Sequence, residues 1–273
     1  MMRSKRWARG NNDMIPKTIH YCWFGGNPLP PLAEKCLASW EKCCPEYEIV
    51  RWDESNYDLE AAPLYVRQAY ELKKWAFVTD YVRLDVIYRH GGIYLDTDVE
   101  LLKPLDPLLI NRAYFGFEDG KYVATGLGFG AEAQHPILKD MMDDYRNISF
   151  VLPDGSLDQT PCPQRNTEAF LRFGLIQDDS LQLLKGGIRI LPSSYLCPID
   201  NRTRTMRKTK DTVSIHHYSA SWQDEVLNKR WRQLQDEHRR EDLLDNIMHA
   251  PNRAAIKILG EEKYGKLKKL LRG

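Results

Sequence analysis

The chain has 273 residues, enough for one large domain with a substantial core. Its 39 Lys and Arg residues almost balance 38 Asp and Glu residues, and a formal net charge of +1 argues against nucleic acid as a partner. The six cysteines have neither Cys-x-x-Cys spacing nor histidines at zinc-site intervals. We therefore expect reduced thiols and a cytoplasmic protein.

Predicted elements alternate between strand and helix along most of the chain. After a strand at residues 17–24, Pro30-Pro31 begins a helix that ends before Pro45, and a second strand covers residues 48–52. Helical periodicity then runs from Pro63 to Arg89 with a break near Lys74. Further strands are expected at 93–95, 114–117, 123–129, 187–191 and 212–217, and further helices at 136–146 and 166–173.

This alternation predicts an α/β fold with helices on both faces of the sheet. We expect a flexible N-terminus at residues 1–15, which is polar and lacks the apolar segment of a signal peptide. Residues 16–222 are the predicted main domain, and residues 223–273 are predicted to be a charged helical appendage. No window approaches eighteen uninterrupted apolar residues, so no membrane span is expected.

Two carboxylates follow a short apolar strand in the middle of the chain. Gly91 and Gly92 fit the end of the preceding helix because glycine accepts a positive φ. Asp96 and Asp98 come directly after the strand at residues 93–95, at the edge where open α/β sheets bind ligands. An isolated Asp-x-Asp is more often a solvated turn. This setting instead favours two oxygen ligands for Mg²⁺ or Mn²⁺ beside substrate phosphates.

Asp80 and Arg83 lie three residues apart on the preceding helix and therefore share one face. Such pairs are commonly surface ion pairs that contribute only about 0.3–0.5 kcal/mol. One helix upstream of the Asp-x-Asp, a second role is open: Arg83 can donate to a phosphate or sugar oxygen, and Asp80 can accept from hydroxyls.

Residues 212–217 alternate with a period of two. The apolar face of this strand carries Val213, Ile215 and His217. A lone histidine there is commonly a hydrogen-bonded core residue, but together with a distant Asp-x-Asp it is a candidate metal ligand. His216 is adjacent, so the choice between the two imidazoles stays open. Ser221 and Trp222 follow in a loop that can fold over a phosphate.

Four blocks of the chain, in this order, resemble the Asp-x-Asp sugar transferases of glycosyltransferase family 32, which include bacterial capsular and exopolysaccharide enzymes. The blocks are residues 19–26, 79–83, 91–98 and 217–222. They are also similar to the catalytic domain of the large glucosylating bacterial toxins. The resemblance covers roughly residues 16–222 and implies a GT-A fold with a mixed central sheet.

The resemblance also implies Mn²⁺ or Mg²⁺, a nucleotide-sugar donor, with a UDP-sugar expected, and transfer of a hexose or related sugar with retention. The expected acceptor is a glycan or lipid-linked glycan in capsular polysaccharide synthesis. By resemblance, Trp23 stacks on the base and the backbone of Cys22 meets the base edge. Asp80 and Arg83 match positions that hold the donor sugar and phosphate, and Tyr94 matches a tyrosine near the diphosphate.

The remaining site residues follow from the same resemblance. Asp96 matches a carboxylate that touches ribose and sugar, and Asp98 matches the direct metal ligand. His217 stands where related enzymes place a further metal ligand. Ser221 and Trp222 match the loop that closes on the leaving group.

Three further segments carry weaker signals. The run Gly126-Leu127-Gly128-Phe129-Gly130 lacks the spacing of a phosphate loop and indicates either a close backbone approach beside the donor sugar or a strand bulge. Residues 149–165 read as a long mobile loop that, with Asn166, Thr167 and Glu168, lies where an acceptor could bind. Residues 253–272 carry seven basic residues. That tail is either a solvated helix on its own domain or a peripheral contact with the inner face of the membrane.

Two rival functions remain open. A metal-dependent phosphohydrolase could use an Asp-x-Asp loop, but such loops usually have a hydroxyl two residues after the second Asp, where this chain has Glu100. A sugar-nucleotide-binding protein without turnover would keep the same pocket. Phosphatase activity on simple esters would favour the first, and metal-dependent UDP binding without turnover would favour the second.

Overall fold

The computed structural model describes residues 14–199, 205–219 and 263. The elements belong to one compact unit, Met1–Asp200 with Met206–Trp222. Its strands are β1 (Thr18–Cys22), β2 (Glu48–Trp52), β3 (Gly92–Tyr94), β4 (Val99–Leu101), β5 (Ala113–Gly116), β6 (Phe129–Ala131), β7 (Gln182–Leu184), β8 (Ile188–Leu191) and β9 (Ser214–His216). Its helices are α1 (Pro31–Cys43), α2 (Leu64–Glu71), α3 (Trp75–His90), α4 (Pro136–Arg146), α5 (Cys162–Arg172) and α6 (Ser193–Leu196), with 3₁₀ turns η1 (Asp106–Leu108) and η2 (Thr125–Leu127).

The main sheet has seven strands in the order β2-β1-β3-β6-β5-β8-β7. Strands β2, β1 and β3 are parallel, β6 runs antiparallel to both β3 and β5, and β8 is parallel to β5. The carboxyl ends of β1, β2 and β3 therefore lie at one edge, where Trp23, Asp53 and Asp96 follow the strands. The predicted α/β fold with a mixed central sheet is confirmed.

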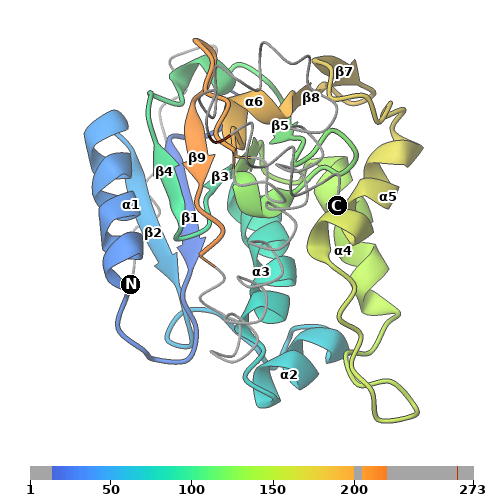
Figure 1. Ribbon diagram of the computed structural model, residues 1–273. Coiled ribbons are helices and arrows are strands. Elements are labelled where there is room, and N and C mark those ends of the chain that lie inside the picture. Colours follow the sequence, from blue (N-terminus) through green and yellow to red (C-terminus); the bar gives the residue numbers. More distant parts are fainter. Residues whose placement is uncertain (1–13, 200–204, 220–262, 264–273) are drawn as a thin grey trace. The chain divides into compact units, whose positions relative to one another are not determined.

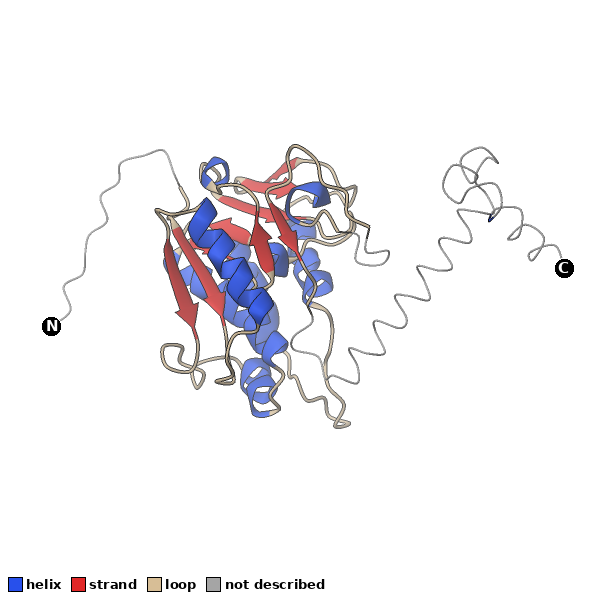
Figure 2. Cartoon of the chain, turned by 60° about the vertical axis from the view of Figure 1, so that its left-hand side comes forward, coloured by secondary structure: helices blue, strands red, loops and turns tan. Residues whose placement is uncertain are grey.

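Both faces of the sheet are covered, and each has its own apolar core (Figures 1 and 2). Residues of α2, α3, α4 and α5 pack on one face, around side chains such as Tyr94 and Phe115. On the other face α1, β4 and α6 pack over Ile19, Tyr21 and Ile93. Strand alternation divides these side chains, because successive residues of β1 and β3 point to opposite faces.

Strand β3 meets β1 closely at Gly92, and only glycine fits there. Gly92 has φ +106°, and a Cβ on it would lie 2.7 Å from Thr18 O. Gly91, with φ +66°, ends α3 and its N–H donates to Ile87 O. This reversal delivers the chain from α3 straight into a buried strand that leads to Asp96.

Most predicted elements occur in the structure, with differences near glycine and proline. The prediction of a strand at 123–129 is wrong. The turn η2 and Gly128, with φ +108°, interrupt this segment, and only Phe129 belongs to β6. Helix α5 begins at Cys162 rather than Asn166, since Pro163 fits its first turn. Within the predicted loop 149–165, a bridge joins Val151 to Leu157.

Several predictions concern residues that the structure does not describe. The flexible N-terminus at 1–15 is described only from residue 14, and the appendage at 223–273 only at residue 263. Within the described ranges, no helix is long and apolar enough to cross a bilayer. All six cysteines are free thiols.

A second, two-stranded sheet was not predicted, and it positions the site. Strand β4 pairs antiparallel with β9, and the pair lies against α1 and α6 (Figure 1). Trp40 of α1 is fully buried and donates from Nε1 to Val99 O at 2.7 Å. Ser39 Oγ accepts from the Leu101 N–H at 2.9 Å. Helix α1 thus fixes β4 through hydrogen bonds to its backbone.

We predict that Trp40→Phe lowers the free energy of unfolding by about 2 kcal/mol, because it shrinks a buried side chain and leaves the Val99 carbonyl unpaired. Urea denaturation measures this change. Glu41→Ala, at an exposed position of the same helix, is the control and should change stability by less than about 0.5 kcal/mol. Equal stability of the Trp40 variant and wild type would contradict the proposed anchoring.

Candidate functional site

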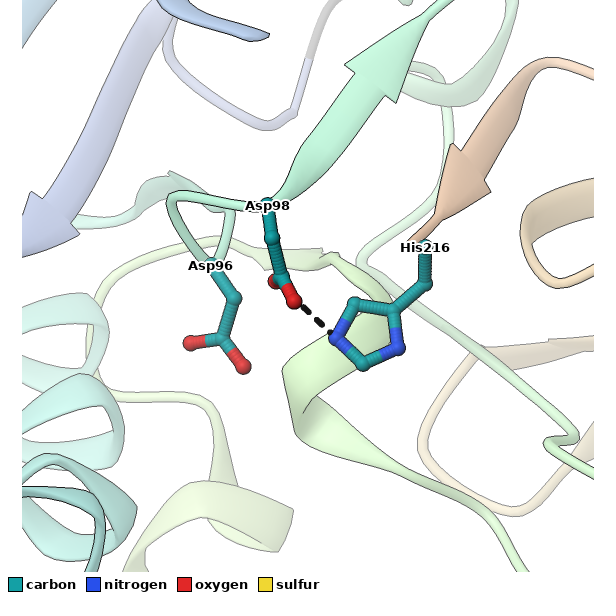
Figure 3. Close-up of side chains that lie close together, drawn as sticks. All are labelled: Asp96, Asp98 and His216. Atoms are coloured by element: carbon teal, nitrogen blue, oxygen red, sulfur yellow. Dashed lines mark ion pairs between the residues drawn. The ribbon is translucent and has the colours of Figure 1, made fainter. Parts of the chain in front are cut away.

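Asp96, Asp98 and His216 converge where the two sheets meet (Figure 3). One ligand atom from each lies within 4.8 Å of the others. His216 Nε2 is 3.1 Å from Asp98 Oδ1, and both side chains are only 13% exposed. Among the described residues, these three side chains form a group that could hold a metal ion.

The register of the small sheet brings these residues together. Val99 of β4 pairs with His216 of β9, and the His217 N–H donates to Asp98 O at 3.0 Å. Asp98 therefore stands directly before β4, and His216 at the end of β9. Asp96 reaches the same place from the carboxyl end of β3, two residues upstream in the chain.

Asp98 is held on both oxygens. While Oδ1 faces His216, Oδ2 accepts from the Ser219 N–H at 2.8 Å and from the Ser219 hydroxyl at 2.9 Å. Burial raises the pKa of Asp98, but His216 and Ser219 together outweigh it and hold the pKa well below its usual value. Burial lowers the pKa of His216, but the nearby Asp98 and Asp96 outweigh burial and raise the pKa above its ordinary value.

His217, the residue predicted as a metal ligand, does not face the carboxylates of the Asp-x-Asp. Adjacent residues of a strand point to opposite sides. His216 consequently faces Asp98, whereas His217 Nε2 lies 2.8 Å from Glu100 Oε2, which also binds Lys35 Nζ at 3.1 Å. Of the two imidazoles that the sequence left open, the geometry favours His216, and metal binding by either residue stays a prediction.

Arg83 forms the second part of the site, next to Asp96. Its Nη2 lies 3.1 Å from Asp80 Oδ1 and 3.4 Å from Asp96 Oδ1, and its guanidinium lies 5.0 Å from the centre of the Tyr94 ring. Tyr94 donates to Asp96 Oδ1 at 2.9 Å, and Arg83 Nε donates to Thr79 O at 3.0 Å. The structure thus brings four predicted site residues into one network.

This network is buried, and burial governs its charges. Asp80 is 7% exposed and Arg83 is 4% exposed. Burial raises the pKa of Asp80 to about 6, even though Arg83 opposes the shift. Burial also raises the pKa of Asp96, and Asp98 adds to the effect while Arg83 opposes it. The pair Asp80 and Arg83 is therefore no solvated surface ion pair.

Gly126 lets the backbone of η2 approach this network. A Cβ there would lie 2.6 Å from Asp96 Oδ2 and 3.2 Å from Arg83 Nη1. The close backbone approach predicted for this glycine run is thus observed, at Asp96. The side chain before it, Thr125, is fully buried and lies within 3.1 Å of both Cys162 and Asn166.

A cleft of about 620 Å³ opens beside the carboxyl ends of β1 and β2. Its lining consists of Gly25, Gly26, Asn27, Glu54, Tyr70, Lys73 and Trp75. Cys22 is buried at the end of β1, and half-buried Trp23 donates from Nε1 to Asn27 O at 2.6 Å. Trp23 therefore lies next to the cleft, while Trp75 and Tyr70 are the aromatic side chains within its lining.

Ser221 and Trp222 lie outside the described residues, so their predicted role stays a prediction. The sequence analysis did not identify Ser219, which donates twice to Asp98. The available signal was that its hydroxyl lies two residues before Ser221, which was predicted to bind phosphate. The sequence analysis also missed Tyr218, whose hydroxyl lies 2.7 Å from Cys197 Sγ. No local pattern indicated that contact.

The donor set fits a divalent cation. Two carboxylates and one imidazole combine the oxygen and nitrogen ligands that suit Mn²⁺ and similar ions. His216 Nδ1 is buried without a hydrogen-bond partner, so the structure does not commit this imidazole to a second internal contact. Asp98 and His216 would be direct ligands, with Asp96 beside them.

Residues 30–115 match the family model described as "Glycosyltransferase sugar-binding region containing DXD motif". Over 146 residues the chain is 32% identical to inositol phosphoceramide mannosyltransferase 3 of Schizosaccharomyces pombe, covering 50% of this chain and 38% of that protein. It is 30% identical over 146 residues to the initiation-specific alpha-1,6-mannosyltransferase of Candida albicans, covering 50% and 37%. Among solved structures it is similar to PaToxG glycosyltransferase at 18% identity and a TM-score of 0.45, covering 58% and 69%.

The matched region contains Asp80, Arg83, Asp96 and Asp98, the residues that the structure gathers. The described domain is thus a mixed α/β domain that carries a region similar to the sugar-binding region of Asp-x-Asp glycosyltransferases. The chain spans less than half the length of the two curated relatives.

We predict that His216→Ala weakens Mn²⁺ binding at least about 10-fold, because it removes a proposed ligand. His217→Ala is the matched control: it removes the neighbouring imidazole and its contact with Glu100, but it keeps the contact between His216 and Asp98. Isothermal titration calorimetry with Mn²⁺ measures both variants. Loss of binding in the His217 variant alone would show that the register assigned to β9 is wrong.

Proposed function

We propose that this protein is a metal-dependent glycosyltransferase that moves a hexose or related sugar from a nucleotide sugar to an acceptor. The observation that carries the proposal is the junction of Asp96, Asp98 and His216 with the buried Arg83–Asp80 pair. The four residues Asp80, Arg83, Asp96 and Asp98 lie within the segment that matches the sugar-binding region. His216 belongs to β9, which pairs with β4 of that segment. A cation site beside a buried guanidinium suits a substrate that carries both a diphosphate and a sugar.

Asp98 and His216 would hold Mn²⁺ or Mg²⁺, which when bound stabilises negative charge on the departing diphosphate. Arg83 donates to a phosphate or sugar oxygen, and it does so from a fixed position because Thr79 and Asp80 already orient its guanidinium. Arg83 is almost completely buried, so its donors act more strongly than they would in solvent.

Asp80 and Asp96 supply acceptors for hydroxyl groups of the donor. Asp96 Oδ1 accepts from the Tyr94 hydroxyl, Oδ2 accepts from Arg83 Nη1 at 3.4 Å, and the backbone at Gly126 approaches Oδ2 closely. A carboxylate held in this way orients a sugar ring without needing to react with it. Asp80 and Asp96 both contact Arg83 Nη2, and the two carboxylates hold that side chain in place and raise its pKa against the effect of burial.

We place the base of the nucleotide in the cleft beside Trp23. The cleft lies at the carboxyl ends of parallel strands, the usual binding edge of open α/β sheets. The aromatic side chains of Tyr70 and Trp75 in the lining suit a planar base. Cys22 precedes the lining residue Gly25 by three positions, and its backbone is proposed to contact the edge of the base. A UDP-sugar is the donor that we propose, with Ser221 and Trp222 closing on its diphosphate.

The proposed acceptor is a glycan or a lipid-linked glycan. The names of two curated relatives, inositol phosphoceramide mannosyltransferase 3 and the initiation-specific alpha-1,6-mannosyltransferase, support this proposal. We further propose polysaccharide synthesis on the cytoplasmic side of the membrane, with the basic residues 253–272 as a peripheral lipid contact. Transfer with retention is part of the same hypothesis.

The proposed activity is tested by measuring UDP release from a panel of UDP-sugars with and without Mn²⁺. We expect metal-dependent release from one donor and none with Asp98→Ala, which removes a proposed ligand. The protein's folding is checked by circular dichroism in both cases. Mn²⁺-dependent UDP binding without release, even with glycan acceptors added, would instead support a binding protein without turnover, and hydrolysis of simple phosphate esters would support a phosphohydrolase.

The linkage formed is a separate test. Nuclear magnetic resonance of the product from an α-linked donor is expected to show an α linkage. A β linkage would contradict retention while leaving the transferase assignment intact.

We predict that Trp75→Ala raises the Kd for UDP by about 5- to 150-fold, the equivalent of losing about 1–3 kcal/mol of base stacking. Equilibrium binding of UDP in Mn²⁺ measures the change. Leu72→Ala, an exposed position on the neighbouring turn and outside the cleft lining, is the control. Unchanged UDP affinity in the Trp75 variant would place the base elsewhere.

A further inference from the structure

Tyr218 has a backbone conformation that requires an explanation. Its φ is +51°, in the left-handed region that a bulky side chain rarely adopts. It lies between His216, which faces Asp98, and Ser219, which donates twice to Asp98. A residue held in such a conformation at a functional site implies that its surroundings stabilise it.

The side chain of Tyr218 is anchored outside the small sheet. Its hydroxyl lies 2.7 Å from Sγ of buried Cys197, which directly follows α6. A hydrogen bond with the same hydroxyl lowers the pKa of Glu118, although burial raises it overall. Glu118 follows β5, and its N–H donates to Tyr122 O at 2.8 Å. Neither Cys197, which follows α6, nor Glu118, which follows β5, belongs to the small sheet.

The ring of Tyr218 also packs against the imidazole of His216. The two ring centres are 4.3 Å apart, and the planes meet at 72°, an edge-to-face arrangement. The chain reversal at Tyr218 then turns Ser219 back toward Asp98. As a result, one segment of four residues sets the imidazole orientation and both hydrogen bonds to Asp98 Oδ2.

We propose that Tyr218 is a positioning residue: its hydroxyl, held by Cys197 and Glu118, fixes the segment His216–Ser219 on Asp98 and so shapes the cation site. Because Ser219 occupies Oδ2, Oδ1 is the oxygen that faces His216. Residues that orient metal ligands in this way typically change metal affinity 10- to 100-fold when altered. The consequence for metal affinity rests on the proposed function, whereas the positioning of Ser219 does not.

Two variants separate the anchor from the backbone conformation. Tyr218→Phe keeps the ring and the left-handed φ but loses the hydroxyl. Tyr218→Gly adopts the same φ without strain but loses the anchor altogether. Tyr57→Phe is the matched control, since it removes another partly buried tyrosine hydroxyl, which donates to Asp85 Oδ2 at 2.7 Å away from the site.

The first readout is hydrogen exchange at the Ser219 amide in metal-free protein, with the melting temperature as a check on folding. We expect the amide to exchange at least about 10-fold faster in both Tyr218 variants, while the Leu102 amide, which donates to Val213 O near the other end of the small sheet, keeps its protection. The Tyr57 variant should behave as wild type at both amides. Unchanged exchange at Ser219 in the folded Tyr218→Phe variant would overturn the proposal.

The second readout is Mn²⁺ affinity by calorimetry. We expect about a 10-fold or greater rise in the Kd of Tyr218→Phe and Tyr218→Gly, and no change in Tyr57→Phe. Wild-type Mn²⁺ affinity in a Tyr218 variant with accelerated Ser219 exchange would overturn the role in shaping the cation site. If wild type itself binds no Mn²⁺, the metal part of the proposed function fails, and the exchange result still decides the positioning role.

Discussion

The site depends on the pairing of β4 with β9. This short ladder brings Asp98 against Ser219, 121 residues away in the chain, and aligns His216 with Val99. Three backbone pairs alone would be marginal. The sheet persists because α1 binds β4 through Trp40 and Ser39, and because Ser194 O and Tyr195 O receive hydrogen bonds from Thr212 and Val213 on the strand's approach.

The second constraint is the concentration of charge in a buried place. Asp80, Asp96 and Asp98 stand close together, and burial opposes ionisation of each. Arg83 and His216 offset that charge, with Arg83 between Asp80 and Asp96 and His216 against Asp98. Such an arrangement is costly for stability and is characteristic of sites that bind a charged ligand. A bound cation would displace the proton from His216 and offset the carboxylates in its place.

The sequence predicted the parts of this architecture that local patterns control. Helix α4 and strand β2 have the predicted bounds, because prolines and alternation mark them clearly. The Asp-x-Asp and the Arg83–Asp80 pair could also be found, since each is a local spacing on one element. The run 123–129 looked like a strand because its apolar residues outweighed the glycines, whose positive φ and close approach decide the structure.

Other features depend on tertiary register and were beyond local reasoning. Whether His216 or His217 meets Asp98 is decided by which residue pairs with Val99, and a shift of one residue would exchange their roles. Strand β7 has only three residues, of which only Leu184 is buried, so it has no periodicity from which a strand could be predicted. The anchoring of Tyr218 joins three segments, and no one of them shows it alone.

The most direct test of the account is the position of a bound cation. Crystals grown with Mn²⁺ and UDP, measured at the manganese absorption edge, would locate the ion by anomalous scattering. The account predicts a peak contacting the Asp98 carboxylate and the His216 imidazole, with Asp96 alongside. A peak at His217 and Glu100, or no ordered ion while UDP is bound, would contradict it.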